Sequence, residues 1–570
     1  MQHDSSEGRN LILAIILSML VIFAWQYFFA PPPPTEEMVK QEGSDAGMEP
    51  AIPDDQARVV EVQDRETLLA QSQRLPITSD TVTGSLQAQS LRFDDLQLPR
   101  YHLTVNPDSP PVTLLSPAKG ENSYFAEFGW LATDSSIRVP DSATQWQNEG
   151  EALTPEQSIT ANWENGQGLQ FTRKVAIEGE YLFNIEQRVT NNSDTPVTLY
   201  PYGRVNRTFA DDKKHFFILH EGPLGVFNDR LSELTYEDLR DEPNQSYKTQ
   251  RGWVGITDKY WLTALIPDAD TPFTARMKFS EVRGRGTYQT DYTGNGVTVA
   301  PGETITLNHR LFAGAKKVAL LEHYADDLGI PLFDRAVDFG ALYFLTKPIF
   351  HALDFFNSWL GSFGLAILLL TVCIKLIMFP LANKSYKAMS QMKLLMPKIQ
   401  ELREQYGDDK MKLNQEVMAL YKREKVNPAS GCVPILIQIP VFFALYKVLF
   451  ITIEMRHAPF YGWIEDLSAP DPTTLFNFFG LFPWDVPAFL MIGAWPLIMC
   501  VTMVIQQRLN PPPSDPAQAM VMKFLPFVFL FLFATFPAGL VIYWAWNNTL
   551  SIIQQWLIMQ RYKRTHHVAK

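Results

Sequence analysis

The stretch that decides the fold of this chain is residues 365–380, LAILLLTVCIKLIMFP. It is apolar enough to lie in a lipid bilayer, and yet it contains Lys375. A charge near the centre of a membrane helix costs roughly 2.5–3.5 kcal/mol on insertion scales. Residues 359–380 are therefore predicted to span a membrane, and the lysine needs either a short route to water or a function.

The rest of the chain divides into a polar part and an apolar part. The chain has 570 residues, of which 46% are hydrophobic, and a formal net charge of −12. Residues 31–325 hold 27 Lys and Arg against 42 Asp and Glu, so this segment carries all of the acidic excess. The remainder is apolar and slightly basic, as is typical of a membrane protein. All three cysteines fall in or beside apolar stretches, and their spacing is not that of a metal site.

The first apolar run, residues 11–30, is long enough to cross a membrane. It ends in aromatic residues followed by four prolines, whereas a cleaved signal peptide is shorter and ends at small residues. We expect residues 1–30 to form an uncleaved N-terminal transmembrane anchor. Residues 31–60 are rich in Pro, Glu, Gln and Asp and are predicted to be a disordered linker.

Residues 61–325 have the period-two pattern of half-buried strands. Tyr181, Phe183, Ile185 and Val189 mostly alternate with polar residues, a turn follows at 191–194, and residues 197–200 resume a strand. Similar runs occur at 169–175, 261–266 and 304–311, and long helical periodicity is scarce. We predict a large β-sandwich domain.

The pattern changes again near residue 329. Residues 330–357 combine an apolar face with charges and Pro348, which predicts an amphipathic helix lying in the membrane interface. The core, residues 358–560, contains five predicted transmembrane helices, so the anchor raises the total to six. The five helices are expected at residues 359–380, 433–453, 488–506, 520–536 and 539–559.

The distribution of Lys and Arg predicts the orientation. The loop 381–431 carries ten of them, whereas the loop 454–487 carries only Arg456. The positive-inside rule therefore places 381–431 and the basic tail 561–570 in the cytoplasm. Both termini are then cytoplasmic and the β-sandwich lies outside. The basic residues are read as a positive-inside face and not as a nucleic-acid site.

The loop 381–431 is itself predicted to form a cytoplasmic helical hairpin. Met392 and Met396 belong to a heptad-like stripe, Gly407 ends the first helix, and Asp408 or Asp409 caps the second. The methionines either pack in the seam between the two helices or offer a soft surface to apolar segments of other proteins. The sequence leaves both readings open.

Several motifs in the apolar part carry a family resemblance. They are residues 407–410 (GDDK), 416–428 (EVMALYKREKVNP), 434–440 (PILIQIP), 515–516 (DP) and 536–540 (FPAGL). With them, residues 330–560 resemble the YidC family of bacterial membrane protein insertases, whose relatives assemble proteins in mitochondria and chloroplasts. The anchor and the large outer β-domain resemble the Gram-negative form.

The resemblance implies a five-helix insertase core with a polar groove, open to the cytoplasm and to lipid. A positive charge in the groove, normally arginine and here Lys375, attracts acidic segments of the substrate. Lysine retains the charge but lacks the planar fork of arginine. Other polar groups in the predicted spans, Thr371, Gln438, Tyr543, Asn547 and Asn548, are candidates for the groove wall or for bonds between helices. Phe442 and Trp544 are candidates for substrate contact, or for packing and lipid contact.

The family further implies nascent membrane proteins as substrates, the Sec translocon as a partner, and contacts with ribosomes and lipids. It needs no cofactor, metal or covalent step. The fold class predicted is a membrane α-helical protein with a periplasmic β-sandwich domain, located in the bacterial inner membrane.

Three alternatives remain at this stage. Lys375 lies about 9 Å from the loop at 1.5 Å per residue, so its side chain could simply reach water. A transporter or channel with an external sensor domain would also have six spans and a buried charge, although matching halves are not evident. A glycan-processing enzyme is an alternative because Asp211, Asp212 and His215 cluster, but a polar loop explains them better.

Overall fold

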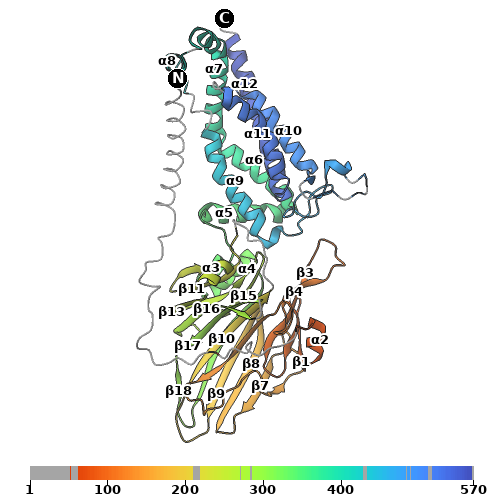
Figure 1. Ribbon diagram of the computed structural model, residues 1–570, viewed down its shortest axis with the longest axis vertical. Helices are drawn as coiled ribbons and strands as arrows, with labels where there is room; N and C mark the ends of the chain where they lie inside the picture. The colour runs from red at the N-terminus through yellow and green to blue at the C-terminus, as the bar shows by residue number, and fades with distance from the viewer. Residues whose placement is uncertain are drawn as a thin grey trace.

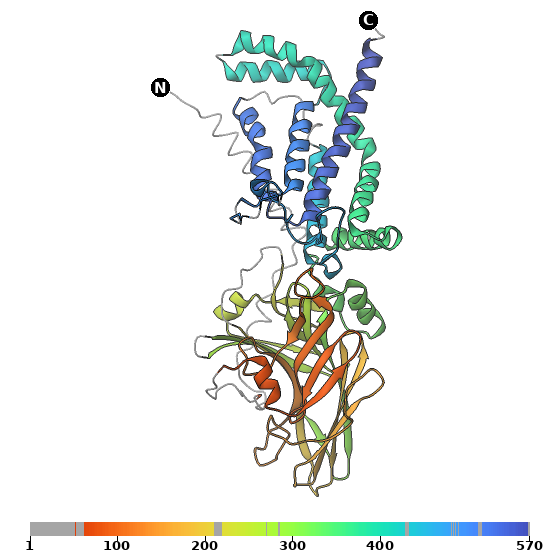
Figure 2. The same ribbon diagram turned by 90° about the vertical axis from the view of Figure 1, so that its right-hand side faces the viewer.

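The computed structural model consists of a β-rich domain and a helical domain, stacked end to end (Figure 1). It describes Ile52 and residues 62–209, 219–269, 271–282, 285–407, 409–427, 433–479, 481–482, 484, 486–487, 490–510 and 516–567. The predicted anchor 1–30, nearly all of the linker 31–60, and Asp211, Asp212 and His215 lie outside these residues. Figure 2 shows the helices of the helical domain standing above the sheets of the β-domain.

The β-domain is built from two antiparallel sheets. Within the described residues, the first sheet has the main order β1-β2-β3-β5-β10-β17-β16-β13, with β4 paired to β3 and β18 to β10. Its strands are β1 (Arg74–Thr78), β2 (Thr83–Gln87), β3 (Arg92–His102), β4 (Pro111–Leu115), β5 (Tyr124–Ala132), β10 (Val197–Phe209), β13 (Asn244–Thr249), β16 (Phe273–Val282), β17 (Arg285–Gly294) and β18 (Val297–Val299).

The second sheet has the order β12-β11-β14-β15-β19-β9-β8-β7-β6. Its strands are β6 (Gln147–Glu149), β7 (Ile159–Glu164), β8 (Leu169–Gly179), β9 (Leu182–Asn191), β11 (Gly222–Phe227), β12 (Arg230–Glu233), β14 (Gly252–Thr257), β15 (Trp261–Ile266) and β19 (Thr304–Ala315). Short helices α2 (Arg65–Ala70), α3 (Tyr236–Asp241) and α4 (Val318–Asp327) accompany the sheets.

The alternating strand pattern of the sequence reflects one shared core between the sheets. In β8 the side chains of Leu169, Phe171, Arg173 and Val175 are buried, while the alternate side chains, Gln170, Thr172 and Lys174, are more exposed. Phe93 of the first sheet meets Phe183 of the second edge to face, with ring centroids 5.1 Å apart. Burial of such side chains contributes about 1.5–3 kcal/mol each. The runs predicted at 169–175, 261–266 and 304–311 all lie within strands.

The predicted interfacial helix is shorter than the pattern suggested. Helix α5 covers Tyr343–Leu360, and the short 3-10 helix η3 covers Phe333–Ala336. Phe333 is buried in the β-domain core, where its ring contacts those of Trp253 and Phe312 at 5.3 and 5.4 Å. Phe333 therefore belongs to the β-domain packing, whereas the Phe339 ring contacts Tyr343 and Phe350 of α5 at 5.8 and 6.1 Å. Helix α5 lies across the end of the helical domain, facing the sheets (Figure 1).

The helical domain contains α6 (Phe363–Ile377), α7 (Phe379–Tyr406), α8 (Lys410–Arg423), α9 (Val433–Ile451), α10 (Ala494–Leu509), α11 (Pro516–Phe533) and α12 (Ala538–His567). Within the described residues, no single helix meets the length and hydropathy of a membrane span. Helices α6 and α7 meet them together and are bent by 68° at Met378. The five predicted spans overlap α6 and the start of α7, α9, α10, α11 and α12, although their bounds differ: α10 begins only at Ala494 and α11 ends at Phe533.

Helices α7 and α8 pack against each other at the end of the bundle far from the sheets (Figure 2). Gly407 follows the last residue of α7, and the Asp409 side chain accepts a 3.0 Å hydrogen bond from the Lys412 amide at the start of α8. Asp408 lies outside the described residues.

The two domains share a continuous apolar cluster and a few polar contacts. Lys447 of α9 forms a 2.7 Å ion pair with Asp338, which also accepts a hydrogen bond from the His220 amide at 3.0 Å. The Val318 amide at the start of α4 donates to Glu454 Oε1 at 2.9 Å. These contacts fix the β-domain against the end of α9.

Candidate functional site

Lys375 lies in the last turn of α6, and its side chain is directed toward α12. Its Nζ donates a 2.8 Å hydrogen bond to Ser551 Oγ, and the Ser551 hydroxyl in turn donates to the Asn547 carbonyl at 2.8 Å. The lysine is half-buried and Ser551 is 3% exposed. Among the described residues no carboxylate forms an ion pair with Lys375. The cation is thus held by a neutral oxygen.

Ser551 belongs to a line of polar side chains along one face of α12. We call Tyr543, Asn547, Ser551 and Gln555 the polar stripe, because residues four apart lie on the same helix face. The stripe is about 18 Å long, at 1.5 Å per residue. All four side chains are buried.

Three neighbouring helices supply partners to this part of α12. Gln438 of α9 donates to the Tyr543 hydroxyl, and Asn548 donates to Thr502 of α10 at 3.3 Å. Gln555 donates to the Asn510 side chain at 3.1 Å, while its own carbonyl oxygen is buried without a hydrogen bond. The interior around α12 therefore contains polar atoms from α6, α9 and α10.

Thr371, one turn before Lys375, is 1% exposed. Its hydroxyl donates to the Ile367 carbonyl of its own helix at 2.7 Å. The residue lies near the lysine, but its donor is already used within α6.

Phe442 and Trp544 pack against each other, with ring centroids 4.7 Å apart and an edge-to-face geometry. Both also contact Phe533 of α11, at 6.1 and 5.0 Å. Their rings join α9, α11 and α12. The residues predicted for substrate contact therefore also hold the helices together.

The predicted hairpin residues lie in the contact between α7 and α8. Met392 is buried and Met396 is partly buried, in a cluster that includes Val417 and Leu420 of α8 and Ile558 of α12. The methionines exposed on this pair of helices are Met411 and Met418, at 67% and 57%. A soft binding surface, if used, would consist of these exposed side chains.

Ser551, Gln555, Thr502 and the buried Tyr386 were not predicted from the sequence. Serine and threonine are common in membrane helices, so their presence alone carries little signal. The four-residue spacing of Tyr543, Asn547, Ser551 and Gln555 was the available signal.

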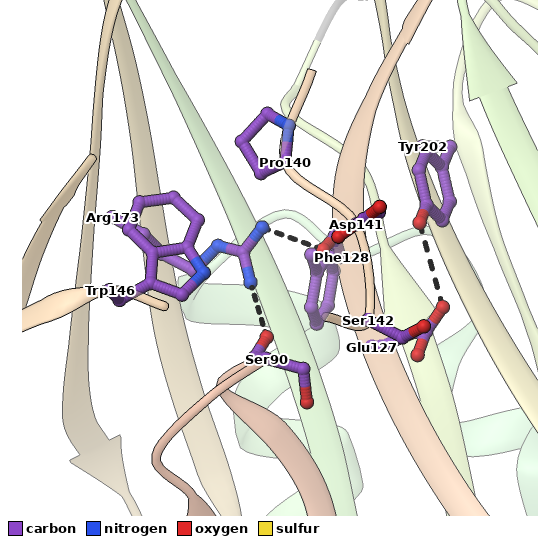
Figure 3. Close-up of a pocket in the computed structure, with 9 residues that line it drawn as sticks. All are labelled: Ser90, Glu127, Phe128, Pro140, Asp141, Ser142, Trp146, Arg173 and Tyr202. Carbon is purple, nitrogen blue, oxygen red and sulfur yellow. Dashed lines mark hydrogen bonds between the residues drawn. The ribbon is translucent and has the colours of Figure 1, made fainter. Parts of the chain in front are cut away.

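The β-domain contains a separate small pocket lined by β5, β8 and β10, by Ser90 before β3 and by the segment 140–146 (Figure 3). Arg173 donates to the Phe128 carbonyl at 2.7 Å and to the Ser90 carbonyl at 3.2 Å, and its guanidinium lies over the Trp146 ring. The cavity volume is about 10 Å³. That is room for about one water molecule and too little for a sugar.

Glu127 at the edge of this pocket is a fully compensated buried charge. Arg92 and Arg204 approach its two carboxylate oxygens at 2.7 Å each, and Arg204 lies directly opposite it in the β5–β10 pairing. Burial by itself would raise the pKa of Glu127, but the two guanidinium groups outweigh it and lower the pKa to about 2. These residues stabilise the sheet.

Comparison with known proteins gives two matching family models. Residues 74–352 match the YidC periplasmic domain, and residues 355–565 match the 60Kd inner membrane protein family. The membrane protein insertase YidC of Rickettsia felis is 48% identical over 560 residues, covering 96% of this chain and 98% of the relative. The chain belongs to the YidC family of membrane protein insertases. It is accordingly a bacterial inner-membrane insertase with a β-rich periplasmic domain and a helical core, and not an enzyme.

Two solved structures show more distant likeness. A crystal structure of an active YidC insertase, with its first transmembrane domain resolved, is 16% identical and covers 95% of this chain and 98% of that one, with a TM-score of 0.36. A putative aldose 1-epimerase from Escherichia coli K12 is 8% identical and covers 43% of this chain and 99% of that one, with a TM-score of 0.29.

Proposed function

We propose that this YidC family member inserts newly made membrane proteins by drawing an acidic substrate segment toward Lys375, along the polar stripe of α12. The observation that carries the proposal is the hydrogen bond from Lys375 to Ser551, which turns the cation into the bundle instead of toward solvent. A cation held only by a neutral hydroxyl keeps its full attraction for an incoming carboxylate.

The attraction is strong enough for capture and weak enough for release. At about 4 Å and an effective dielectric constant near 20, a lysine–carboxylate pair gains roughly 4 kcal/mol before the cost of desolvation. Lysine offers a point charge and not a two-pronged hydrogen-bonding group, so one carboxylate oxygen suffices. The substrate leaves when its apolar helix enters the lipid, and no nucleotide or covalent step is involved.

The polar groups around Lys375 have distinct roles in this mechanism. Asn547, Gln438 and Tyr543 form a polar groove wall that shortens the hydrocarbon path for the substrate's polar tail. Thr371 fills space beside the lysine, since its hydroxyl bonds its own helix. Phe442 and Trp544 contact the apolar part of the substrate while they join the helices.

The orientation follows the charge distribution. Loop 381–431, with ten basic residues, and the tail 561–570 face the cytoplasm, as do both termini, while the β-domain is periplasmic. The α7–α8 pair, including Met392, Met396 and the Gly407 to Asp409 turn, then meets substrates as they emerge from ribosomes. The protein acts alone or beside the Sec translocon, in contact with lipid.

Charge exchange at Lys375 tests the proposal. In the assay, purified protein is reconstituted in liposomes without ATP, and the insertion of a single-span substrate with either an acidic or a basic translocated tail is measured. We expect Lys375→Arg to retain insertion of the acidic tail, Lys375→Ala to reduce it, and Lys375→Glu to reduce it most. The ratio of basic-tail to acidic-tail insertion should be higher for Lys375→Glu than for the parent.

Two outcomes would contradict the proposal. Equal insertion of both tails by all variants would mean that the lysine merely reaches water. Solute flux across the liposomes without any insertion would favour the transporter reading. As a control for stability, the circular dichroism spectrum and the thermal unfolding of each variant in detergent are compared with those of the parent.

A further inference from the structure

The segment between α9 and α10 exposes a dense set of aromatic side chains. Residues 472–484, PTTLFNFFGLFPW, contain no charged residue. Leu481 is 75% exposed and Phe478 is 62% exposed. Exposed apolar side chains gathered in one place mark an interaction surface. We call the following six residues the aromatic loop surface: Phe476, Phe478, Phe479, Leu481, Phe482 and Trp484.

The loop that carries this surface is firmly attached to the helical domain. Asp471 is 3% exposed and accepts hydrogen bonds from Trp463 Nε1 at 3.0 Å and from the Trp495 amide, in the first turn of α10, at 2.9 Å. The Thr474 hydroxyl donates to the Leu490 carbonyl at 3.0 Å. The aromatic side chains thus project from a loop that hydrogen bonds fix to the helical domain.

The loop satisfies several of its own polar groups. The Phe479 amide donates to the Thr474 carbonyl at 2.8 Å, the Phe482 amide donates to the Asn477 carbonyl at 3.1 Å, and Trp484 Nε1 donates to the Phe476 carbonyl at 3.0 Å. Groups paired in this way lower the cost of moving a segment out of water.

Two consecutive residues of the surface have an unfavourable backbone. Phe478 and Phe479 have φ angles of 53° and 60°, in the left-handed region that favours glycine. Each such residue costs about 1–2 kcal/mol. The exposed rings also stack on one another, with Phe482 and Trp484 centroids 4.6 Å apart. The hydrogen bonds of the loop hold this strained conformation, which presents the aromatic rings to the outside.

The position of the loop indicates which partner fits. It lies at the β-domain end of the bundle, on the side opposite α5 and at about the same height along the helices (Figures 1 and 2). Helix α5 exposes Phe344, Phe355 and Trp359 at this level. Farther along the bundle, α10 exposes Ile498 and Val501. Exposed aromatic residues therefore occur on two opposite sides of the bundle, in the loop and in α5.

We propose that the aromatic loop surface is an interfacial anchor that inserts into the headgroup region of the periplasmic leaflet. Bands of Trp, Tyr and Phe at one height are what a bilayer interface selects. An uncharged loop also suits a lipid surface better than it suits the basic or acidic segments of a protein partner. Together with α5, the anchor holds the helical domain at a defined depth and tilt. The inference rests on the membrane location of the family and not on the role of Lys375.

Depth measurement in vesicles tests the proposal. Nitroxide labels are placed at Leu481→Cys and Phe478→Cys in the full chain, with Cys373, Cys432 and Cys500 replaced by Ala, in vesicles of phosphatidylethanolamine and phosphatidylglycerol. We expect oxygen to reach both labels more readily than a water-soluble nickel chelate. A label at Glu151→Cys, exposed on the β-domain, serves as the aqueous control and should show the reverse order.

A second variant separates lipid contact from other occupants. Leu481→Asp changes a side chain that packs little, so the fold and the insertion activity measured on the same sample should persist. In this variant the label at position 478 should become more accessible to the nickel chelate and less accessible to oxygen than in the parent. Higher nickel than oxygen accessibility in the parent would overturn the proposal. So would low accessibility to both reagents, which means protein contact, or an unchanged depth in Leu481→Asp.

Discussion

The β-domain and the helical domain each bury a charge, but they compensate it differently. Glu127 is clamped between Arg92 and Arg204 at 2.7 Å, with Tyr202 nearby, so its charge is fully used inside the sheet. Lys375 is turned into the helical bundle and bonds only the neutral hydroxyl of Ser551 among the described residues. One charge is committed to the fold, and the other is available to a partner.

We propose that this difference separates a structural from a functional buried charge. A compensated charge holds strands together, and removing one member leaves the others unpaired at high cost. A charge with only neutral partners adds little to the fold, and a substrate carboxylate can supply the missing counter-charge. Lys375 lies in the segment, residues 355–565, that matches the 60Kd inner membrane protein family.

The largest effect is expected from Glu127→Ala. It leaves two buried guanidinium groups without their counter-charge, which costs about 3–5 kcal/mol. Thermal unfolding of the full chain, followed by near-ultraviolet circular dichroism, should show early loss of the β-domain signal. Glu121→Ala, at an exposed position, is the matched control. If Glu127→Ala unfolded like the parent, the clamp would not be structural.

The same carboxylate predicts an acid dependence. The pKa of Glu127 is lowered to about 2, whereas an unfolded glutamate titrates near 4.3. Its contribution to stability is therefore present above about 4.3 and is lost as the pH falls through about 2. The parent should lose β-domain stability in that window, and Glu127→Gln should lose less.

Glu454 at the domain junction is an intermediate case, with one oxygen bonded to the Val318 amide and the other buried without a partner. Burial raises its pKa to about 7. Because the folded pKa is raised, its stability contribution is complete below about 4.3 and declines as the pH rises through 7. Between pH 5 and pH 8, Glu454 should lower the free energy of unfolding by roughly 1–3 kcal/mol, and Glu454→Gln should abolish this loss. The variant should therefore show a smaller difference in Tm between the two pH values than the parent. If the difference in Tm between pH 5 and pH 8 were the same in the variant and the parent, another group would cause the pH dependence.

A smaller effect is expected from Ser551→Ala, which removes the hydroxyl that positions Lys375. The loss of one hydrogen bond is worth about 0.5–1.5 kcal/mol, or roughly a two- to tenfold lower rate of acidic-tail insertion. Ser551→Thr retains the hydroxyl and should restore the rate. In a Lys375→Met background, Ser551→Ala should have no further effect on insertion. An equal loss in both backgrounds would assign Ser551 to packing alone.

The smallest effect is expected from Thr371→Val. The hydroxyl bonds its own helix, so its removal should change stability by less than about 1 kcal/mol and leave acidic-tail insertion nearly unchanged. Insertion is measured in the same liposome assay as for Ser551→Ala. A large loss of insertion with normal stability would show that the Thr371 hydroxyl serves the substrate, and would make Lys375 one of two polar contacts.

The local patterns predicted much of the fold. The run at residues 261–266 coincides with β15, and the run at 304–311 lies within β19, because alternation directly reports which side chains face the core. The apolar stretches located the helices for a similar reason. The interfacial helix was extended too far toward its N-terminus, because an apolar face does not reveal whether lipid or the β-domain covers it.

The candidate site was predicted less completely. Lys375 stood out because a charge in an apolar run is rare, and the family motifs supported it. Ser551 was not identified, since a serine 176 positions away becomes relevant only when α6 and α12 pack together. The aromatic loop surface was noted in the sequence only as a loop poor in basic residues, and its exposure depends on the fold of residues 471–484.

The sequence by itself determined the family, the division into a polar β-domain and an apolar helical core, and the unusual lysine, because composition and periodicity are local properties. The tertiary structure alone decided what each buried charge meets. Glu127, Arg92 and Arg204 are far apart in the chain and come together through strand register, while Lys375 meets Ser551 through helix packing. Burial makes such pairings energetically decisive, and burial exists only once the chain has folded.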